Sequence, residues 1–276
     1  MSDFEDSLGR TRTARVWRVG ADGEFDTVIV ERAVELVLNG RVLVRTSCLP
    51  DRLEDLALGF LCTEGLIADP AAITECNVAP DGGRVEIRAD VDPDRLVLFR
   101  ERVAISSGCG SGASAAAEAL TPVASDARFS PEDLLARMKD LLQASVLFRE
   151  TGGVHAASLT DSQTLLVFAE DIGRHNAVDK AIGGALRQGV DLGSAALLTT
   201  GRASSDIVAK AVRAGLPAVV SRGAVTSRAI ELARSVDAAV VGFARGRRLN
   251  VYTAAWRFGL MNPARGTTRN ERRTRQ

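Results

Sequence analysis

The sequence predicts an α/β protein, and three observations carry that prediction. In the second half, strand-like apolar segments alternate with helix-favouring segments, an order typical of βαβ units and a largely parallel sheet. In the first half, alternating apolar runs joined by turn dipeptides predict an α+β part. Pro, Ser and Asp residues between 121 and 128 indicate the connection between the halves. The predicted domains are 1–125 and 126–260, followed by a basic, disordered tail at 261–276.

The N-terminal part is predicted to contain two hairpins and a helix. Asn39-Gly40 joins two alternating apolar runs within 33–47, and this dipeptide is the strongest short hairpin signal. The stretch around 81–83, Asp-Gly-Gly, indicates a second hairpin. A helix is expected over 53–63, with Asp51 as its cap and a glycine just past its end.

The C-terminal part begins with a well-marked helix. Ser130 is the expected N-cap, Pro131 follows in the first turn, and the helix should run to about Arg149 before Gly152-Gly153 ends it. The predicted strands that follow are 164–169, 195–200, 217–221 and 238–244, the predicted helices are 177–186, 206–214 and 228–236, and a last strand lies near 249–252.

Composition and charge exclude several classes of protein. Hydrophobic residues make up 46% of the 276 residues, which is enough for a sizeable core. Lys and Arg together number 35 and so do Asp and Glu, so the net charge gives no reason to expect nucleic acid or membrane as a partner. The N-terminus is polar, and no apolar run approaches the ~20 residues that span a bilayer. The expected compartment is the cytoplasm.

The cysteines favour chemistry at one position. Four cysteines without a CxxC pair, and only two histidines, predict neither a disulfide framework nor a metal site. Cys109 lies between glycines in SSGCGSGAS, ahead of an Ala-rich helical segment that would favour its thiolate. It is predicted to be a nucleophile or sulfur carrier, and the alternative is an incidental loop cysteine. Cys62 is expected in the core, and Cys48 and Cys76 as fillers in strands or loops.

Arginine-containing loops follow the four predicted strands. Their sequences are EDIGRHN, TTGRASS, SRGAVTS and FARGRR. Because ligands of open α/β sheets bind at the carboxyl ends of the strands, we expect these loops to share one edge. Glycine allows close backbone approach and guanidinium groups suit phosphates, so the set predicts a nucleotide or polyphosphate ligand. The alternative is a set of solvated loop charges. The arginines are Arg174, Arg202, Arg222, Arg245, Arg247 and Arg248.

The two histidines allow two interpretations. His155 follows the glycines of ETGGVHAASL, and His175 lies in the first arginine loop. Each is either a hydrogen-bonded structural residue or a group that positions an anion or moves a proton near neutral pH. The carboxylates Glu170 and Asp171 could orient His175 or Lys180.

Six segments together resemble the FdhD/NarQ family of formate dehydrogenase accessory sulfurtransferases. They occur in the family's order, and the most specific of them is EDIGRHNAVDKAIGGAL at 170–186. The others are LEDLALGFLCTEGLI at 53–67, SGCGSG at 107–112, ETGGVHAASL at 150–159, GRASSDIVAKAVRAGLPAVVSRGAVTSRAIELA at 201–233 and GFARGRRLNVY at 242–252.

The resemblance implies a function in molybdenum cofactor biosynthesis. It implies a cytoplasmic homodimer with a cytidine-deaminase-like C-terminal part, in which Cys109 receives sulfur from a cysteine desulfurase as a persulfide. The sulfur then passes to the molybdenum of a bis-molybdopterin guanine dinucleotide cofactor, before formate dehydrogenase receives that cofactor. GDP or a related guanine nucleotide is expected to occupy the same site. The family's cofactor motif falls on Phe243, Ala244, Arg245, Gly246, Arg247 and Arg248, to which the loop analysis adds Arg174, His175, Arg202 and Ser221.

One departure from the family pattern leaves alternatives open. The family's C-G-x-C pair has Gly112 at its second position here, which predicts a single-cysteine relay or, alternatively, a non-catalytic chaperone that binds the cofactor. A zinc deaminase would need H-x-E and P-C-x-x-C, whereas His155 is followed by two alanines. A hydrolase using Cys109 with His155 or His175 is a further alternative.

Overall fold

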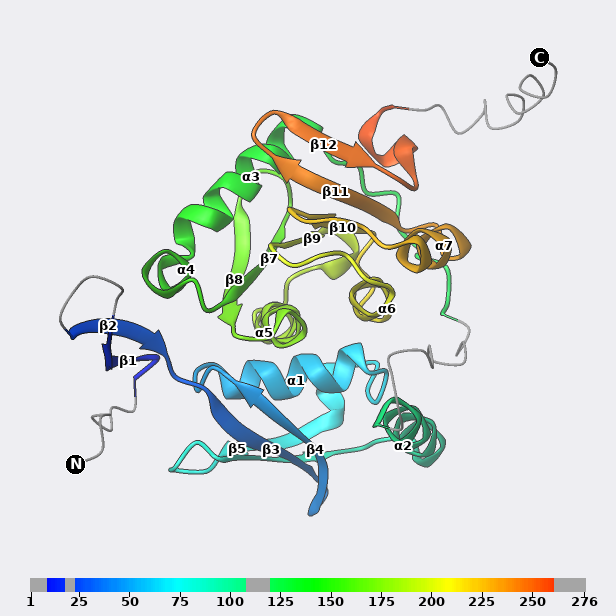
Figure 1. The fold of residues 1–276 in the computed structure, drawn as a ribbon. Coiled ribbons are helices and arrows are strands. Elements are labelled where there is room, and N and C mark those ends of the chain that lie inside the picture. Colours follow the sequence, from blue (N-terminus) through cyan, green and yellow to red (C-terminus); the bar gives the residue numbers. More distant parts are fainter. Residues whose placement is uncertain (1–8, 18–22, 108–119, 261–276) are drawn as a thin grey trace.

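The fold is α/β, and the described residues form two larger sheets with helices between them and a separate two-stranded sheet (Figure 1). The structure is a computed structural model that describes residues 9–17, 23–107 and 120–260. Cys109, Gly112 and the tail at 261–276 lie outside the described residues. Within the described part of the chain, no helix combines the length and the apolar character needed to cross a membrane.

The N-terminal sheet has four strands in the order β4-β3-β6-β5. Both predicted hairpins are confirmed, and the first turns at Asn39 and Gly40 with φ of 50° and 79°, as a tight left-handed turn requires. A separate antiparallel pair precedes this sheet. The strands are β1 (Thr11–Val16), β2 (Glu24–Ile29), β3 (Arg32–Leu38), β4 (Arg41–Cys48), β5 (Ile73–Val78) and β6 (Arg84–Ala89).

Helix α1 (Leu53–Thr63) covers the N-terminal sheet and has the predicted bounds. Its N-cap is Arg52, in the left-handed region, so the prediction that Asp51 caps it is wrong. Asp51 pairs instead with Lys180. The short 3-10 helix η1 (Pro70–Ala72) precedes β5, and α2 (Pro93–Ser107), which sequence reasoning missed, packs Phe99 edge-on against Phe60.

The C-terminal sheet has six strands in the order β12-β11-β10-β9-β7-β8, and it is mixed. A largely parallel sheet was predicted, but only the β9–β10 and β10–β11 pairs are parallel, and the other three pairs of neighbouring strands are antiparallel. An unpredicted strand, β7, forms a hairpin with β8 and separates it from β9. The strands are β7 (His155–Thr160), β8 (Leu165–Asp171), β9 (Ala196–Thr199), β10 (Ala218–Ser221), β11 (Ala239–Arg245) and β12 (Arg248–Val251).

Helices cover both faces of this sheet, and alternate strand residues supply the two cores. Helices α5 (Arg174–Arg187), α6 (Ser205–Arg213) and α7 (Ser227–Ser235) lie on one face, and α3 (Pro131–Ala144) lies on the other (Figure 1). The helix predicted over 130–149 is interrupted at Ser145, whose hydroxyl donates to the buried Glu170 carboxylate, and α4 (Val146–Thr151) follows. Two short 3-10 helices, η2 (Leu192–Ser194) and η3 (Ala255–Phe258), complete the chain.

The N-terminal sheet joins the rest of the molecule through α1, which packs on α5. The two helices cross at glycines: a Cβ at Gly59 would overlap the carbonyl oxygen of Asp179, and one at Gly183 would overlap that of Asp55. The crossing is therefore a backbone-to-backbone contact. Residues 120–130 connect the halves without regular secondary structure, and the domain boundary expected at 125/126 stays a prediction.

We predict that Gly59→Ala lowers the free energy of unfolding by about 3 kcal/mol, because the added methyl group meets backbone atoms that no side-chain rotation can move. The ~1 kcal/mol that alanine gains over glycine in a helix is too small to offset this overlap. Urea denaturation measures the change. The matched control is Gly193→Ala, whose Cβ would lie 3.3 Å from Asp191 Oδ1, and we expect little effect there. Equal stability of Gly59→Ala and wild type would contradict the close crossing.

Candidate basic site at the sheet edge

The arginine loops meet at one edge of the C-terminal sheet, as predicted. Strand β8 runs parallel to β9, β10 and β11, because it is antiparallel to β7, which is itself antiparallel to β9. Hydrogen bonds tie the loops together: Ser221 Oγ donates to Gly201 O over 2.6 Å, and Gly223 N donates to Ser221 Oγ over 2.9 Å. Phe243 N donates to Gly223 O over 2.8 Å, which adds the end of β11.

Ser221 has a structural role in this arrangement. The residue is fully buried, and its hydroxyl is used as both donor and acceptor between the two neighbouring loops. It therefore fixes the loops that carry Arg202 and Arg222. A direct contact between Ser221 and a bound nucleotide stays a prediction.

Arg174 lies at the centre of a group of basic side chains. Its aliphatic chain covers Gly201, where a Cβ would be 2.9 Å from Arg174 Cβ. Partial burial, and next the charge of Arg202, lower the pKa of Arg174. Burial and then Arg174 lower the pKa of both histidines, that of His175 to about 4, so His175 is neutral at pH 7. His155 Nδ1 lies 3.4 Å from Thr200 Oγ1.

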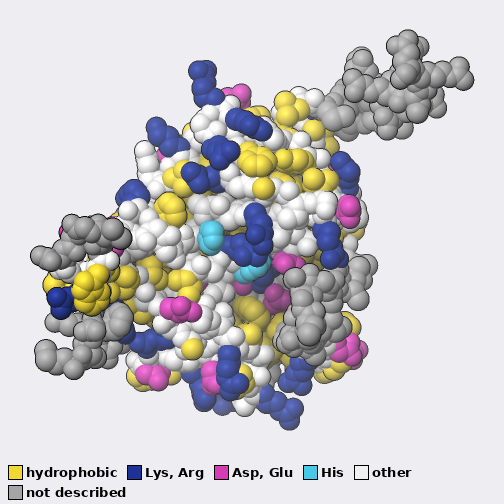
Figure 2. Space-filling model, viewed as in Figure 1, with side chains coloured by type: hydrophobic (Ala, Val, Ile, Leu, Met, Phe, Trp, Pro, Cys, Tyr) yellow, Lys and Arg dark blue, Asp and Glu magenta, His cyan; other side chains and the backbone are white. Residues whose placement is uncertain are grey.

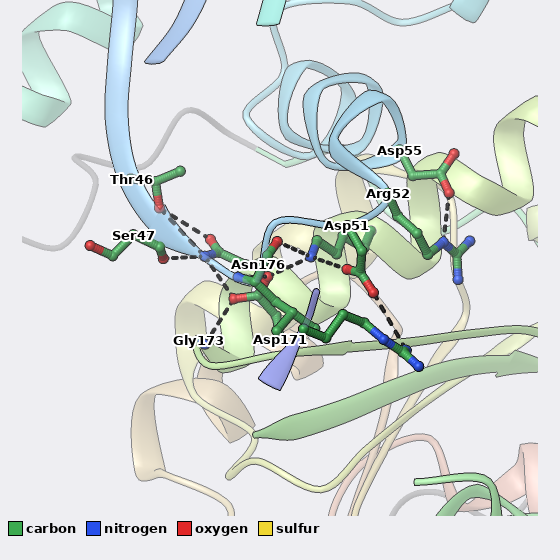
Figure 3. A network of polar contacts seen from close by, with 11 residues as sticks. Thr46, Ser47, Asp51, Arg52, Asp55, Asp171, Gly173 and Asn176 are labelled. Carbon is green, nitrogen blue, oxygen red and sulfur yellow. Dashed lines mark hydrogen bonds and ion pairs between the residues drawn. The ribbon is translucent and has the colours of Figure 1, made fainter. Parts of the chain in front are cut away.

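The loop that carries Arg174 and His175 is held by Asp171 (Figure 3). This fully buried carboxylate accepts hydrogen bonds from Gly173 N at 3.0 Å and Asn176 Nδ2 at 3.1 Å, which fixes the start of α5. It also accepts from Leu49 N at 3.1 Å, in the N-terminal half. Lys180 Nζ lies 2.7 Å from Asp171 Oδ2. Of the two residues that Asp171 was predicted to orient, Lys180 and His175, it therefore contacts Lys180.

A groove of about 640 Å³ opens beside the FARGRR turn. One wall comes from α3 and supplies an apolar surface with a carboxylate and an ammonium group at its rim. The other wall supplies guanidinium groups from the ends of β10 and β11. The lining residues are Glu132, Leu135, Ala136, Met138, Lys139, Leu142, Arg222, Ala244, Arg245, Gly246 and Arg247. Sequence reasoning found the arginines and predicted the helix, but it did not place α3 beside them, because an apolar stripe does not show what the helix packs against.

The turn itself is shaped by an aromatic ring. Gly246 and Arg247 form the loop between paired residues Arg245 and Arg248, and Gly246 has a φ of 61°. The guanidinium groups of Arg245 and Arg248 each lie 5.6 Å from the centroid of the Phe243 ring. Cation–π attraction therefore positions both guanidinium groups against one ring.

The three described cysteines are poor nucleophiles at neutral pH. Burial is the largest cause in each case, and it raises the pKa of Cys48 to about 12 and the pKa values of Cys62 and Cys76 to about 11. The thiolate is the reactive form, so these residues are almost wholly unreactive at pH 7. Cys109 lies outside the described residues.

Comparisons with known proteins agree on one family. A family model described as the FdhD/NarQ family matches residues 29–259. Sulfur carrier protein FdhD of Bacillus subtilis is 36% identical over 253 residues, which are 88% of this chain and 95% of that protein. Sulfur carrier protein FdhD of Wolinella succinogenes is 37% identical over 241 residues, which are 86% of this chain and 84% of that protein.

A solved structure is similar over nearly the whole fold. It is the crystal structure of a protein assigned as a formate dehydrogenase accessory protein, from Desulfotalea psychrophila. The two structures align with a TM-score of 0.73 and 30% sequence identity, covering 90% of this chain and 98% of that chain.

We predict that Asp171→Asn lowers the free energy of unfolding by about 3 kcal/mol, because it leaves the buried Lys180 ammonium with Asp51 as its one remaining carboxylate. The control is Glu54→Gln, which removes an ion pair with Arg187 whose side chains are 46% and 51% exposed. Exposed pairs contribute about 1 kcal/mol or less, so chemical denaturation should separate the two variants. If Asp171→Asn loses no more unfolding free energy than the control does, the buried Asp171–Lys180 pair does not stabilise the fold.

Proposed function

The chain belongs to the FdhD/NarQ family, and from this we propose that it is a sulfur carrier, a protein of the sulfurtransferase type, in the maturation of formate dehydrogenase. The names of the relatives support the carrier role, and the aligned structure supports the connection with formate dehydrogenase. The match spans both sheets, so the proposal concerns the whole described fold.

The sulfur-carrying residue in this proposal is Cys109, fed by a cysteine desulfurase. Its thiolate attacks the outer sulfur of the donor's persulfide, a new S–S bond forms, and the donor leaves as a thiolate. The exchange balances without an external oxidant or reductant. Since the described thiols have raised pKa values, Cys109 has no strong competitor among them at neutral pH. With Gly112 in place of a second thiol, a single cysteine carries the sulfur.

The substrate in this proposal is a bis-molybdopterin guanine dinucleotide cofactor, and the observation that carries it is the basic groove. Arg222, Arg245, Arg247 and Lys139 line this groove, and none of the four forms an ion pair with a carboxylate of the described residues. Unneutralised guanidinium groups around an apolar floor fit the phosphates and the flat ring of a nucleotide. GDP is the corresponding simple ligand.

The remaining parts of the proposal concern assembly. We place the protein in the cytoplasm as a homodimer, with formate dehydrogenase as the client that receives the sulfurated cofactor. The competing function is a chaperone that binds the cofactor without carrying sulfur, and the missing second cysteine at Gly112 is the observation in its favour.

We predict that incubation with a cysteine desulfurase and cysteine adds one sulfur atom to the wild-type chain, detected as an increase in intact mass that a reductant removes. Cys109→Ala should gain none. The matched control is Cys76→Ala, which should gain sulfur as wild type does, because burial and then Glu54 raise the pKa of Cys76 and keep its thiol protonated. An equal gain in Cys109→Ala would remove Cys109 from the mechanism and support the chaperone.

A further inference from the structure

The group around Arg174 presents donors that no described residue uses. Within the described parts of the chain, neither the Arg174 nor the Arg202 side chain forms a hydrogen bond or an ion pair. The Nε atom of Arg174 and the Nε2 atom of His175 are buried and have no hydrogen-bond partner among the described residues. Buried polar groups are normally paired, so two such atoms on adjacent residues indicate a missing partner.

The positive charges of Arg174 and Arg202 also favour the binding of an anion. Arg174 and Arg202 are close enough for their charges to repel, and Asp206, in the first turn of α6, is the one carboxylate that acts against this effect on Arg174. His175 is neutral at pH 7, so it can share a hydrogen bond without adding to the positive charge. A bound anion would relieve the repulsion between the guanidinium groups.

The start of α5 adds backbone donors. The N-cap is Gly173, which offers no side-chain acceptor, so the first N–H groups of α5 are not capped by a side chain. The positive end of the helix dipole lies at the same point. Asp171 accepts hydrogen bonds from Gly173 N, Asn176 Nδ2 and Leu49 N, and it does not cap the first N–H groups of α5.

This group is separate from the groove beside the FARGRR turn. The groove lining includes neither histidine, and it includes neither Arg174 nor Arg202. Arg174 follows β8, whereas the FARGRR turn follows β11, four strand positions away in the sheet. At about 4.8 Å per strand, the ends of β8 and β11 are roughly 19 Å apart, which is too far for one phosphate group to bridge. Arg202 and Arg222 follow the neighbouring strands β9 and β10, so the two sites adjoin between these residues. Figure 2 shows histidine side chains beside Lys or Arg side chains on one face of the molecule.

We propose that Arg174, Arg202, His155 and His175 form a second subsite at the sheet edge, which takes a compact oxyanion while the groove holds a guanine nucleotide. This inference rests on the proposed function in one respect, since it assigns the subsite to the oxygen-rich metal end of the cofactor. The anion accepts hydrogen bonds from the guanidinium groups and the first turn of α5, and the histidines border it.

The test measures two ligands, molybdate and GDP, by isothermal titration calorimetry at constant ionic strength. Molybdate should bind the wild-type chain in the presence of saturating GDP. Arg174→Gln and Arg202→Gln should each weaken molybdate binding by about tenfold, the loss expected for one charge-assisted contact, and leave GDP affinity unchanged. Arg245→Gln and Arg247→Gln should show the reverse pattern.

Two further variants keep the test decisive. Arg174→Lys retains the charge and should bind molybdate better than Arg174→Gln does. This comparison shows whether weaker binding comes from the lost charge or from a disturbed fold. Arg88→Gln, an exposed residue of the N-terminal sheet, should leave both ligands unaffected. Failure of molybdate to bind, competition between molybdate and GDP, or equal losses of both ligands in the same variants would overturn the proposal. None of these results depends on sulfur transfer, so the subsite and the proposed function can fail independently.

Discussion

The close crossing of α1 and α5 is the contact on which the rest of the molecule depends. Gly59 and Gly183 allow the two backbones to touch, so α1, which covers the N-terminal sheet, contacts α5, which covers the C-terminal sheet, without intervening side chains at the crossing. Buried charges flank the crossing. Lys210 Nζ lies 2.9 Å from Asp179 Oδ1 and 2.8 Å from Glu64 Oε1, and although burial opposes it, these two carboxylates raise the pKa of Lys210. Such groups tolerate only one relative position of the two helices, because a displaced charge would remain buried and unpaired.

The crossing also determines where the basic edge lies. Asp171 accepts a hydrogen bond from Leu49 N in the N-terminal half. It also accepts hydrogen bonds from Gly173 N and Asn176 Nδ2 at the start of α5. The loop with Arg174 and His175 is therefore held by contacts from both halves of the chain. For the proposed oxyanion subsite this rigidity favours binding, since less freedom is lost when the ligand binds.

The sequence predicted those features that depend on local signals. Helix α1 and the turn at Asn39-Gly40 occur where the capping glycine and the turn dipeptide indicated. The arginine loops could be placed together because strand direction follows from the order of strands and helices. The unpredicted strand β7, HAASLT, has small residues and weak alternation, and its pairing with both β8 and β9 is non-local. The groove wall from α3, the role of Ser221 and the glycine crossing also depend on contacts between distant segments, which periodicity does not encode.

The proposed reaction assigns binding to the basic edge, which contacts from both halves of the chain hold in place, and sulfur transfer to the thiol of Cys109. The most direct measurement is complementation of a strain that cannot mature formate dehydrogenase, with wild type and Cys109→Ala expressed at equal levels. We expect wild type to restore formate dehydrogenase activity and Cys109→Ala to leave the strain inactive. Full restoration by Cys109→Ala would contradict a sulfur-carrying role.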